Sequence, residues 1–413
     1  MFDFIKKSMA AIPTGNPSQR ALRVSPHFSV PLSDFAAVGE RDAILASSGM
    51  GKSYLTGVLM EETLETGGLL CVIDPEGEHF TLAERYPMMI IGGEHANLPL
   101  EEEGIELYID SMLQFGLSAV FDLSEYLDAE QQHLYAIIAD KLFHAEQKYR
   151  RKIRLVIEEA QIYAPQKTAG VAGSGGSGGT TRSGRKKFLD PLLPSQRIAK
   201  RGRKRAIDSL WATQRPASIS KDILSQCNRF WFGGITAEQD YKAIRPFLNE
   251  AGISFAQIKA LNPGEFYLYA RGKTKLLKVR KRFCKHAGAT PEAGLVFQAT
   301  QNSSLEKAIS QLTEAVAKRS IEKQKEESEL SVLKATIREL NAENERLKKE
   351  LEQEKMATKV IERLGNSPPA SKTASTRSRI KKSVQGIGDN IDPDLPQSTP
   401  ELPFQSEVYI KQI

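Results

Sequence analysis

The stretch Ala46-Ser47-Ser48-Gly49-Met50-Gly51-Lys52-Ser53 decides the fold. It follows a short apolar run that ends at Ala46, and it precedes a helical stretch, KSYLTGVLMEETLE, that begins at Lys52. A strand, a glycine-containing turn and a helix in this order direct backbone N–H groups and a helix N-terminus at a bound phosphate. The stretch lacks only the first glycine of the usual pattern, and the small Ala46 still permits a tight turn. We therefore predict a nucleotide-binding loop.

The side chains of this loop predict how it holds ATP and Mg²⁺. Gly49 and Gly51 let the backbone curl closely around the phosphates. Lys52 is expected to hold the β- and γ-phosphates, and Ser53 to ligate Mg²⁺. The alternative is a glycine turn before a helix with no ligand, which an isolated Gly-Lys-Ser would not exclude. The predicted nucleotide-binding residues are Ser48, Gly49, Met50, Gly51, Lys52, Ser53 and Tyr54.

An apolar run ending in two acids supplies the partner that this loop needs. Residues 153–159, IRLVIEE, place Glu158 and Glu159 at the expected carboxyl edge of a parallel sheet, where ligands bind in such folds. We expect Glu158 to ligate Mg²⁺ and Glu159 to polarise the attacking water. A Glu-Glu pair alone is usually a solvated strand end. Behind an apolar strand, and downstream of a phosphate loop, it favours catalysis.

The rest of the core has the pattern of an α/β protein. Short apolar runs alternate with helical stretches from about residue 31 to 290, as in a parallel sheet with both faces covered. A further run, SLWATQ, ends at Gln214, whose amide could hydrogen-bond a γ-phosphate or the lytic water, or could simply close the strand. The predicted strands are 43–46, 69–73, 119–122, 155–157 and 209–213.

Composition limits the remaining possibilities. The chain has 413 residues, a net charge of +6 and 40% hydrophobic residues, which is ordinary for a globular core with solvated extensions. Its 3 cysteines form no CxxC pair, so a disulfide framework or zinc site is not expected and a cytoplasmic setting is the default. No run is apolar enough to cross a bilayer. The chain is predicted to have no membrane contact.

The chain divides into four predicted regions. Residues 1–30 are read as an N-terminal arm and 31–290 as the ATPase domain, with a flexible glycine-rich and basic insertion at 166–197. A heptad helix, a predicted coiled coil, occupies 300–362. Residues 363–413, rich in Ser, Pro and Thr, are predicted to be a disordered tail.

Basic residues crowd between positions 182 and 205. This composition suits sequence-independent contacts with the phosphate backbone of double-stranded DNA. The alternatives are a solvated loop or a surface for an acidic protein. The members of the cluster are Arg182, Arg185, Lys186, Lys187, Arg197, Lys200, Arg201, Arg203, Lys204 and Arg205. A second basic stretch, 273–285, has strand-like alternation and could simply face solvent.

The predicted coil has an apolar seam with alternating three- and four-residue steps. The seam reaches back to Leu305, Ile309, Leu312 and Val316, with an interruption at Arg319, Lys323 and Glu326. Asn344 at an a position favours a parallel two-stranded coil. A single helix packed on the core is the alternative, and the coil's partner could be the same chain or another protein. The seam consists of Leu330, Leu333, Ile337, Leu340, Asn344, Leu347 and Leu351.

Together these features resemble the HerA/FtsK branch of P-loop motors, specifically the ATPase domain of the HerA type. The resemblance covers about residues 31–290 and implies a RecA-like core that binds ATP and Mg²⁺. It is carried, in order, by ASSGMGKS, VIDPEGEH, LVIEEAQIYAP, KRGRKRAIDSLWATQRP, ILSQCNRFWFG, GEFYLY and KVRKRFCKHAGATP.

The resemblance also implies a homohexameric ring that hydrolyses ATP between subunits and threads double-stranded DNA. An arginine on the helix before the third strand reaches the neighbour's site in this family, and the matching segment offers Arg203, with Arg201 as the alternative. The chain departs from the family at Gln161, where histidine is common, in its glycine-rich insertion, and in having little room for an N-terminal barrel. A nucleotide-controlled scaffold that recruits a protein through the coil is the alternative function.

Overall fold

The computed structural model describes residues 21–26, 28–31, 40–166, 188–287, 299–300 and 302–365. The chain forms two compact units, Met1–Glu329 and Leu330–Ile413, which are described separately. The strands are β1 (Ala21–Ser25), β2 (Phe28–Pro31), β3 (Arg41–Leu45), β4 (Leu69–Asp74), β5 (Met88–Ile91), β6 (Ser118–Asp122), β7 (Ile153–Ile157), β8 (Ile207–Thr213), β9 (Arg229–Phe232), β10 (Glu265–Ala270) and β11 (Lys273–Lys278). The helices are α3 (Lys52–Glu65), η2 (Phe80–Glu84), η3 (Glu102–Gly104), α4 (Ile105–Phe115), α5 (Asp128–Tyr149), α6 (Ala160–Tyr163), α7 (Leu192–Arg201), η4 (Gly202–Arg205), α8 (Lys221–Leu224), α9 (Glu238–Glu250), α10 (Phe255–Lys259) and α11 (Ser303–Gly365).

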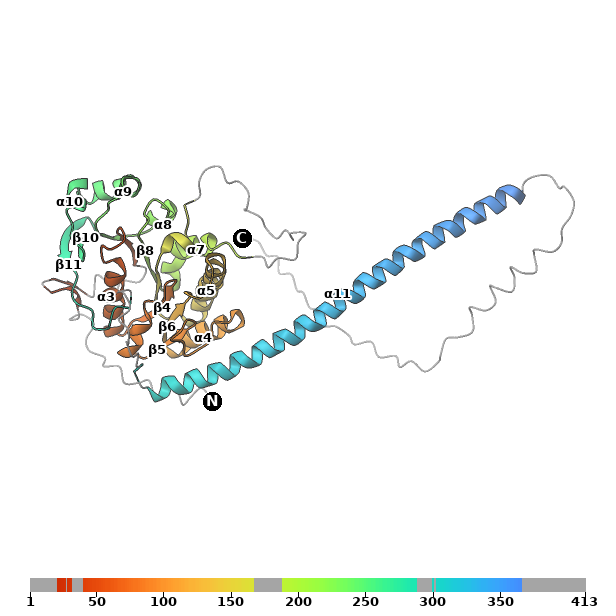
Figure 1. Cartoon of the computed structure of the whole chain (residues 1–413), viewed down its shortest axis with the longest axis horizontal. Helices are drawn as coiled ribbons and strands as arrows, with labels where there is room; N and C mark the ends of the chain where they lie inside the picture. Colours follow the sequence, from red (N-terminus) through yellow and green to blue (C-terminus); the bar gives the residue numbers. More distant parts are fainter. Residues whose placement is uncertain are drawn as a thin grey trace, which may run out of the picture. The chain divides into compact units, whose positions relative to one another are not determined.

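A nine-stranded sheet organises the first unit, in the order β11-β10-β9-β3-β8-β7-β4-β6-β5 (Figure 1). All pairs from β9 to β5 are parallel, whereas β10 pairs antiparallel with both β9 and β11. The chain order and the sheet order differ, so β3, which leads into the phosphate loop, lies between β8 and β9. Beyond β8, the next strand of the sheet is β7. The carboxyl ends of β3, β8 and β7 therefore meet at one edge.

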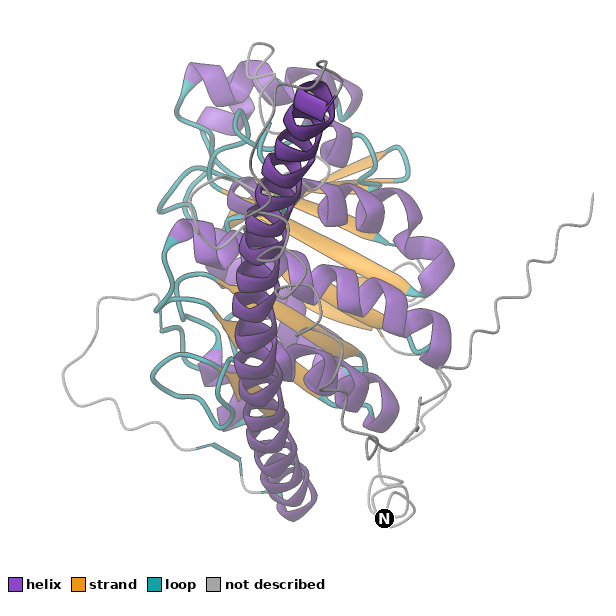
Figure 2. Ribbon diagram, turned by 90° about the vertical axis from the view of Figure 1, so that its right-hand side faces the viewer, coloured by secondary structure: helices purple, strands orange, loops and turns teal. Residues whose placement is uncertain are grey.

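Helices cover both faces of this sheet (Figure 2). Successive residues of a strand point to opposite faces, so Leu45 and Ile73 join one buried cluster while Ile44 and Val72 join the other. The first cluster includes side chains of α4, α5, α7 and α9, and the second includes the apolar face of α3. Because both faces are buried, the central strands are nearly all apolar.

The predicted α/β class and the five predicted strands are confirmed. They correspond to β3, β4, β6, β7 and β8, each within a few residues of the predicted bounds. Four other core strands were not assigned. The run MMII of β5 and the aromatic run RFWF of β9 are too short to separate from buried helix by pattern, and β10 with β11 forms an antiparallel hairpin outside the β-α alternation.

Two predicted boundaries differ from the structure. Residues 21–25 and 28–31, all but the last of which belong to the predicted N-terminal arm, form the antiparallel hairpin β1–β2. The predicted insertion ends earlier than expected, because 192–197 already belong to α7, whose Leu192 and Ile198 are buried in the core. The basic residues Arg182, Arg185, Lys186 and Lys187, residues 167–187 as a whole, and the predicted tail from 366 onward lie outside the described residues.

The hairpin β10–β11 forms one edge of the sheet. Five of the six residues of β11, KTKLLK, are exposed, and only Leu277 is buried. The second basic stretch of the sequence thus begins on an edge strand, where its lysines face solvent.

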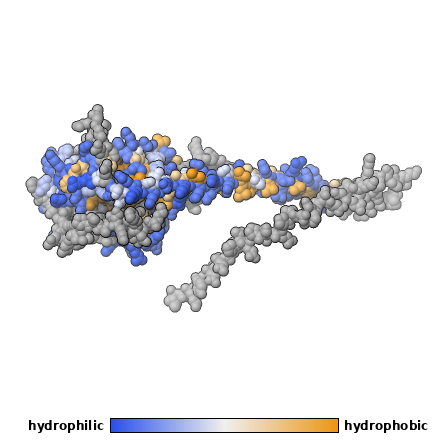
Figure 3. All heavy atoms as spheres, turned by 90° about the horizontal axis from the view of Figure 1, so that it is seen from below, coloured by the Kyte–Doolittle hydropathy of each residue, from blue (hydrophilic) through white to orange (hydrophobic). Residues whose placement is uncertain are grey.

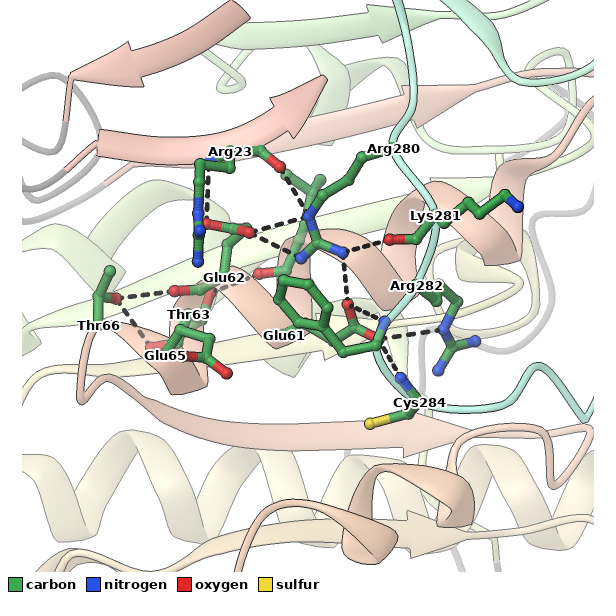
Figure 4. A network of polar contacts seen from close by, with 12 residues as sticks. Arg23, Glu61, Glu62, Thr63, Glu65, Thr66, Arg280, Lys281, Arg282 and Cys284 are labelled. Atoms are coloured by element: carbon green, nitrogen blue, oxygen red, sulfur yellow. Dashed lines mark hydrogen bonds and ion pairs between the residues drawn. The ribbon is translucent and has the colours of Figure 1, made fainter. Parts of the chain in front are cut away.

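An arginine network fastens the chain that follows β11 onto α3 (Figure 4). Arg280 Nη1 lies 2.7 Å from Glu61 Oε2, and its Nη2 lies 2.7 Å from Glu62 Oε1. The same guanidinium donates to the carbonyl of Arg23 at 2.7 Å, which adds β1 to the network. Glu61 also accepts the backbone N–H groups of Phe283 and Cys284. All three charged groups are buried, so the helix that starts at Lys52 is held from its outer side.

The beginning of α11 packs on the core of the first unit. Leu305, Ala308, Leu312 and Val316 are at most 8% exposed and belong to the same buried cluster as α4. Further along, Arg319 donates to Glu106 at 3.0 Å and Lys323 pairs with Glu103. The predicted coil seam is therefore wrong for this part of the helix. The early leucines face the core, and the polar interruption contacts η3 and α4.

The second unit contains the remainder of α11. Its apolar residues alternate with charged ones along the helix (Figure 3). The leucines and the isoleucine of the predicted seam are 48–57% exposed. Among the described residues, no helix is both long enough and apolar enough to cross a membrane.

Candidate nucleotide-binding site

The phosphate loop leaves the buried end of β3 and turns into α3 through two left-handed residues. Gly49 has φ 77° and Gly51 has φ 88°, conformations that favour glycine. A side chain at Gly51 would also meet the backbone of Gly264 at 3.3 Å, and the Gly264 N–H donates to the Met50 carbonyl at 3.1 Å. The loop is thus held in an open curl before the first turn of α3.

The opposite side of the loop rests on the chain after β9. The Ser47 N–H donates to the Gly234 carbonyl at 2.9 Å, and the Thr236 N–H donates to Ser47 Oγ at 3.0 Å. The Met50 side chain lies against Gly234, where an added Cβ would stand 2.4 Å from its terminal methyl. Tyr54 points elsewhere, since its hydroxyl accepts the Arg282 N–H at 2.9 Å. Of the predicted nucleotide-binding set, Tyr54 therefore offers the site its place in the first turn of α3 rather than its side chain.

Lys52 and the two acids converge on one point. Lys52 Nζ lies 2.6 Å from Glu158 Oε2 and 2.8 Å from Glu159 Oε1. All three side chains are at most 8% exposed. Burial alone would lower the pKa of Lys52, but the two carboxylates outweigh it and hold the pKa above its ordinary value. The structure therefore brings together residues that lie far apart in the sequence.

His79 is a member of this cluster for which the sequence analysis predicts no role. The ring is fully buried, and its Nε2 lies 3.3 Å from Glu158 Oε1. Burial would raise the pKa of Glu158, but Lys52 and His79 together hold it well below its usual range. Burial would lower the pKa of His79, but Asp74 and Glu158 raise it. His79 lies in the loop after β4, which pairs with β7, so only the strand order shows that it reaches Glu158.

Glu159 has a left-handed backbone conformation, and a side chain two residues later holds its carboxylate. Its φ is 44°, in the left-handed region that residues with a Cβ rarely adopt. Gln161 Nε2 donates to Glu159 Oε2 at 2.7 Å, and Gln161 Oε1 accepts from the Thr213 hydroxyl at 2.5 Å. A hydrogen-bonded chain therefore runs from the end of β8 through Gln161 to Glu159 and Lys52. The residue that departs from the family pattern is the link in this chain.

Gln214 and the arginine candidates lie at opposite edges of the sheet. Gln214 directly follows β8 at the carboxyl edge, beside the cluster, and is half-buried. Arg201 ends α7 and Arg203 lies on η4, which leads into the amino end of β8. Both arginines are exposed. The strand β8 separates both arginines from Gln214, so neither lies at the carboxyl edge that holds the phosphate loop of its own chain.

A cavity of about 550 Å³ opens beside these arginines. Its lining is Glu146, Gln147, Arg150, Arg203, Lys204, Arg205 and Ala206. It lies at the amino edge of the sheet, away from Lys52, and three of its seven lining side chains are arginines. Glu146 is fully buried there, its carboxylate oxygens have no hydrogen-bond partner among the described residues, and burial raises its pKa to about 7.

Another buried acid, Asp74, shapes the loop that carries His79. Its carboxylate accepts the backbone N–H groups of Gly77 at 3.0 Å and His79 at 2.8 Å. Burial raises the pKa of Asp74 to about 6. This acid sits at the carboxyl end of β4, but its oxygens are used by the backbone of its own loop. It therefore positions His79 rather than facing the phosphate loop.

The oxygens around Lys52 suit a divalent cation that is shared with a triphosphate. Lys52 Nζ reaches Ser53 Oγ at 3.4 Å as well as Glu158, so the hydroxyl and the carboxylate lie close to one buried positive charge. No group of three or more His, Cys, Asp or Glu side chains that could hold a metal alone occurs among the described residues. Hydroxyl and single-carboxylate ligands completed by phosphate oxygens and water are typical of Mg²⁺ in nucleotide sites.

Comparison with known proteins agrees with this geometry. Residues 29–169 match the family described as Helicase HerA, central domain. None of the curated proteins matches the chain. The matched segment contains the phosphate loop, Glu158 and Glu159.

Several solved structures are similar to the chain at low sequence identity. The genome-packaging NTPase B204 from Sulfolobus turreted icosahedral virus 2, in complex with ATP-gammaS, is 12% identical with a TM-score of 0.40, covering 58% of this chain and 98% of that one. VirB4 of Thermoanaerobacter pseudethanolicus is 12% identical with a TM-score of 0.46, covering 64% and 97%. The unbound bacterial conjugative coupling protein TrwBdeltaN70 is 11% identical with a TM-score of 0.45, covering 64% and 90%. From the family match and the cluster of Lys52 with its two acids, we conclude that the chain is a P-loop ATPase whose residues 29–169 match the HerA central domain.

Proposed function

We propose that this chain is a ring-forming motor that hydrolyses ATP at subunit interfaces and translocates or remodels double-stranded DNA. The observation that carries the proposal is the division of the machinery between two edges of the sheet. Lys52, Glu158 and Glu159 meet at the carboxyl edge, whereas Arg203 is exposed at the amino edge. A complete site then requires the carboxyl edge of one protomer and the amino edge of the next, as in a head-to-tail ring.

Each residue of the cluster has a part in the reaction. Lys52 releases the carboxylates when the triphosphate enters and pairs with its β- and γ-oxygens. Glu159 accepts a hydrogen bond from the attacking water and takes its proton as the bond from the water oxygen to the γ-phosphorus forms. The bond between the γ-phosphorus and the β–γ bridging oxygen breaks in the same step, and ADP leaves with that oxygen. Gln161 keeps Glu159 aimed at that water, and Arg203 of the neighbour neutralises charge on the transferred phosphoryl group. Gln214, at the end of β8, hydrogen-bonds the γ-phosphate or the attacking water, and this contact changes when ATP is hydrolysed.

The cation site belongs to the same scheme. Ser53 and Glu158 would hold Mg²⁺, which neutralises the phosphate oxygens when bound. His79 keeps the Glu158 carboxylate turned toward that position and ionised. Lys52 holds the same carboxylate in the absence of nucleotide. Without nucleotide, the Lys52 ammonium therefore supplies the positive charge that Mg²⁺ would supply to Glu158 when bound.

Exposed cations provide the proposed contact with DNA. Arg201 and Lys204 are exposed on one short stretch, whereas Arg197 pairs with Asp140 and contributes less free charge. Exposed arginines and lysines bind the phosphate backbone independently of sequence, and the affinity falls as salt rises. Arg182, Arg185, Lys186 and Lys187, which lie outside the described residues, belong to the same proposal through the sequence alone.

The motor proposal is tested by the ATPase rate with and without long duplex DNA. We expect stimulation by DNA of unrelated sequences, and a loss of that stimulation as salt is raised. Lys204→Ala should weaken stimulation while the rate without DNA stays unchanged. An assembled oligomer whose rate ignores DNA at low salt would overturn the motor proposal and leave only the ATPase.

A mixing experiment tests whether Arg203 acts in the neighbour's site. Glu159→Gln removes the base, and Arg203→Ala removes the arginine, so each variant alone should be nearly inactive. In mixed rings about a quarter of the interfaces combine an intact Glu159 with an intact Arg203, and activity should return. The mixture of Glu159→Gln with Glu159→Ala is the matched control and should stay inactive. No recovery in the first mixture would show that Arg203 does not act across the interface.

The exposed apolar face of α11 favours a second function. In this alternative the nucleotide controls a scaffold that recruits a protein partner through the coil. A chain ending at Glu329 keeps the docked start of α11 and removes the second unit. DNA-stimulated hydrolysis that survives this truncation supports the motor. Loss of hydrolysis together with partner binding favours the scaffold.

A further inference from the structure

The part of α11 beyond Glu329 has an apolar face that no other described residue covers. Leu330, Leu333, Ile337 and Leu340 are 48–57% exposed, and Leu347 and Leu351 are 54% and 51% exposed. They follow the a and d positions of a heptad over residues 330–351. The same register is covered by the core before residue 319. The helix therefore changes partner along its length, from its own chain to something else.

Charges on either side of the seam identify the partner. Every charged g position in this stretch is acidic and every charged e position is basic. In a parallel, in-register pair, each g residue faces the e residue five positions later on the other helix, which gives three kinds of attractive contact. In an antiparallel pair, g faces g and e faces e, which places like charges together. The g residues are Glu329, Thr336, Glu343 and Glu350, and the e residues are Lys334, Asn341, Lys348 and Lys355.

We propose that residues 330–358 form a parallel, in-register, two-stranded coiled coil with a second copy of this chain. The charge pattern is complementary to itself in that arrangement, so no other protein is required. Asn344 lies opposite its own copy at an a position, which fixes the register and favours two strands. The buried amide of Asn344 finds a hydrogen-bond partner only when the asparagine of the second helix lies directly opposite, so other registers are less stable.

Parallel pairing also fits the symmetry of the proposed motor, and only this fit rests on the proposed function. A cyclic ring turns every protomer about one axis, so all copies of α11 run in the same sense. Neighbouring helices can then pair in parallel, three pairs in a ring of six. The coil joins protomers two by two, whereas the nucleotide sites join each protomer to the next.

Cysteine crosslinking of the full-length chain tests polarity and register. Leu333→Cys and Leu347→Cys each place a thiol at a d position, and Ala342→Cys places one on the outer face as a matched control. The native cysteines provide little background, because Cys71 and Cys284 are buried and Cys227 is half-buried. After air oxidation, each d-position variant alone should run as a covalent dimer, and Ala342→Cys should run as the parent does.

The other outcomes overturn the proposal. Crosslinking only when Leu333→Cys and Leu347→Cys are mixed would show an antiparallel pair. No crosslinking in any variant would show that another protein, or nothing, covers the seam. Neither result depends on nucleotide or DNA, so failure of the coil and failure of the motor are read separately.

A charge exchange tests the basis of self-pairing. Glu343→Lys with Glu350→Lys places lysines opposite Lys348 and Lys355 and should reduce crosslinking of Leu347→Cys. Adding Lys348→Glu and Lys355→Glu to the same chain reverses all four charges and should restore it. Restoration failing in the fourfold variant would refute pairing through these charges.

Discussion

Removal of the Lys52 ammonium should destabilise the nucleotide-free protein, beyond any effect on catalysis. Lys52→Ala leaves Glu158 and Glu159 buried at 4% exposure with no cation between them. Breaking a buried ion pair by removing one partner costs about 3–5 kcal/mol. In a unit of this size, 1 kcal/mol shifts Tm by about 2–4 °C, so Tm should fall by about 6–20 °C.

An exposed ion pair with the same geometry provides the control. Lys242 lies 2.8 Å from Glu238, the same distance as between Lys52 and Glu159. The side chains of Lys242 and Glu238 are both about 70% exposed. Lys242→Ala should therefore leave Tm close to that of the parent, because exposed ion pairs contribute little to stability. The double variant Lys52→Ala with Glu158→Gln should regain part of the lost stability, because one buried charge is gone.

The pH dependence gives a second readout. Lys52 and His79 hold the pKa of Glu158 below its unfolded value of 4.5. In the parent, the ionised Glu158 therefore contributes to the free energy of unfolding above that pH, and this contribution is lost as pH falls through the folded pKa. In Lys52→Ala, burial is opposed by less positive charge, so the pKa rises and the carboxylate can protonate. The deficit of the variant should shrink from pH 8 to pH 5 in thermal unfolding without nucleotide. A deficit no larger than that of Lys242→Ala at pH 8 would refute the reasoning.

Three further predictions follow from buried contacts. Arg280→Met should destabilise the first unit by about 3–5 kcal/mol in thermal unfolding, since it leaves buried carboxylates unpaired; a change below about 1 kcal/mol would contradict the network. Gln161→Leu should lower kcat by about 10- to 100-fold without weakening binding of a fluorescent ATP analogue, because Glu159 loses its orientation; an equal loss of affinity would point to a structural defect instead. Burial raises the pKa of Glu146 to about 7, so ionisation of this carboxyl lowers the stability of the folded protein as pH rises from 4.5 through 7. Relative to the parent, Glu146→Gln should therefore gain about 1–2 kcal/mol of stability between pH 5 and pH 8. A gain that does not depend on pH would refute this cause.

The sequence predicts the parts of the fold that have one strong local signal. The strands β3, β4, β6, β7 and β8 are contiguous apolar runs because helices cover both sides of the sheet. The order of the strands has no such signal. That β3 lies between β8 and β9 depends on how the crossovers pack, and no single run of residues encodes it.

The candidate site divides in the same way. Lys52, Glu158 and Glu159 can be predicted because carboxyl ends of parallel strands share an edge. His79 and Gln161 cannot, because their contacts with the acids depend on strand adjacency and on the left-handed turn at Glu159. The departure at Gln161 was visible in the sequence, but only the Thr213 hydroxyl on its far side shows what the amide does.

The lysines of β11 have a consequence for solubility at high local concentration. An edge strand presents unpaired backbone groups to any other strand that approaches, and charged side chains on it are a common protection against sheet-to-sheet aggregation. Lys273, Lys275 and Lys278 supply such charges on an exposed strand. Copies of the chain crowded into one assembly would repel each other at this edge, so that growth into an extended intermolecular sheet is discouraged.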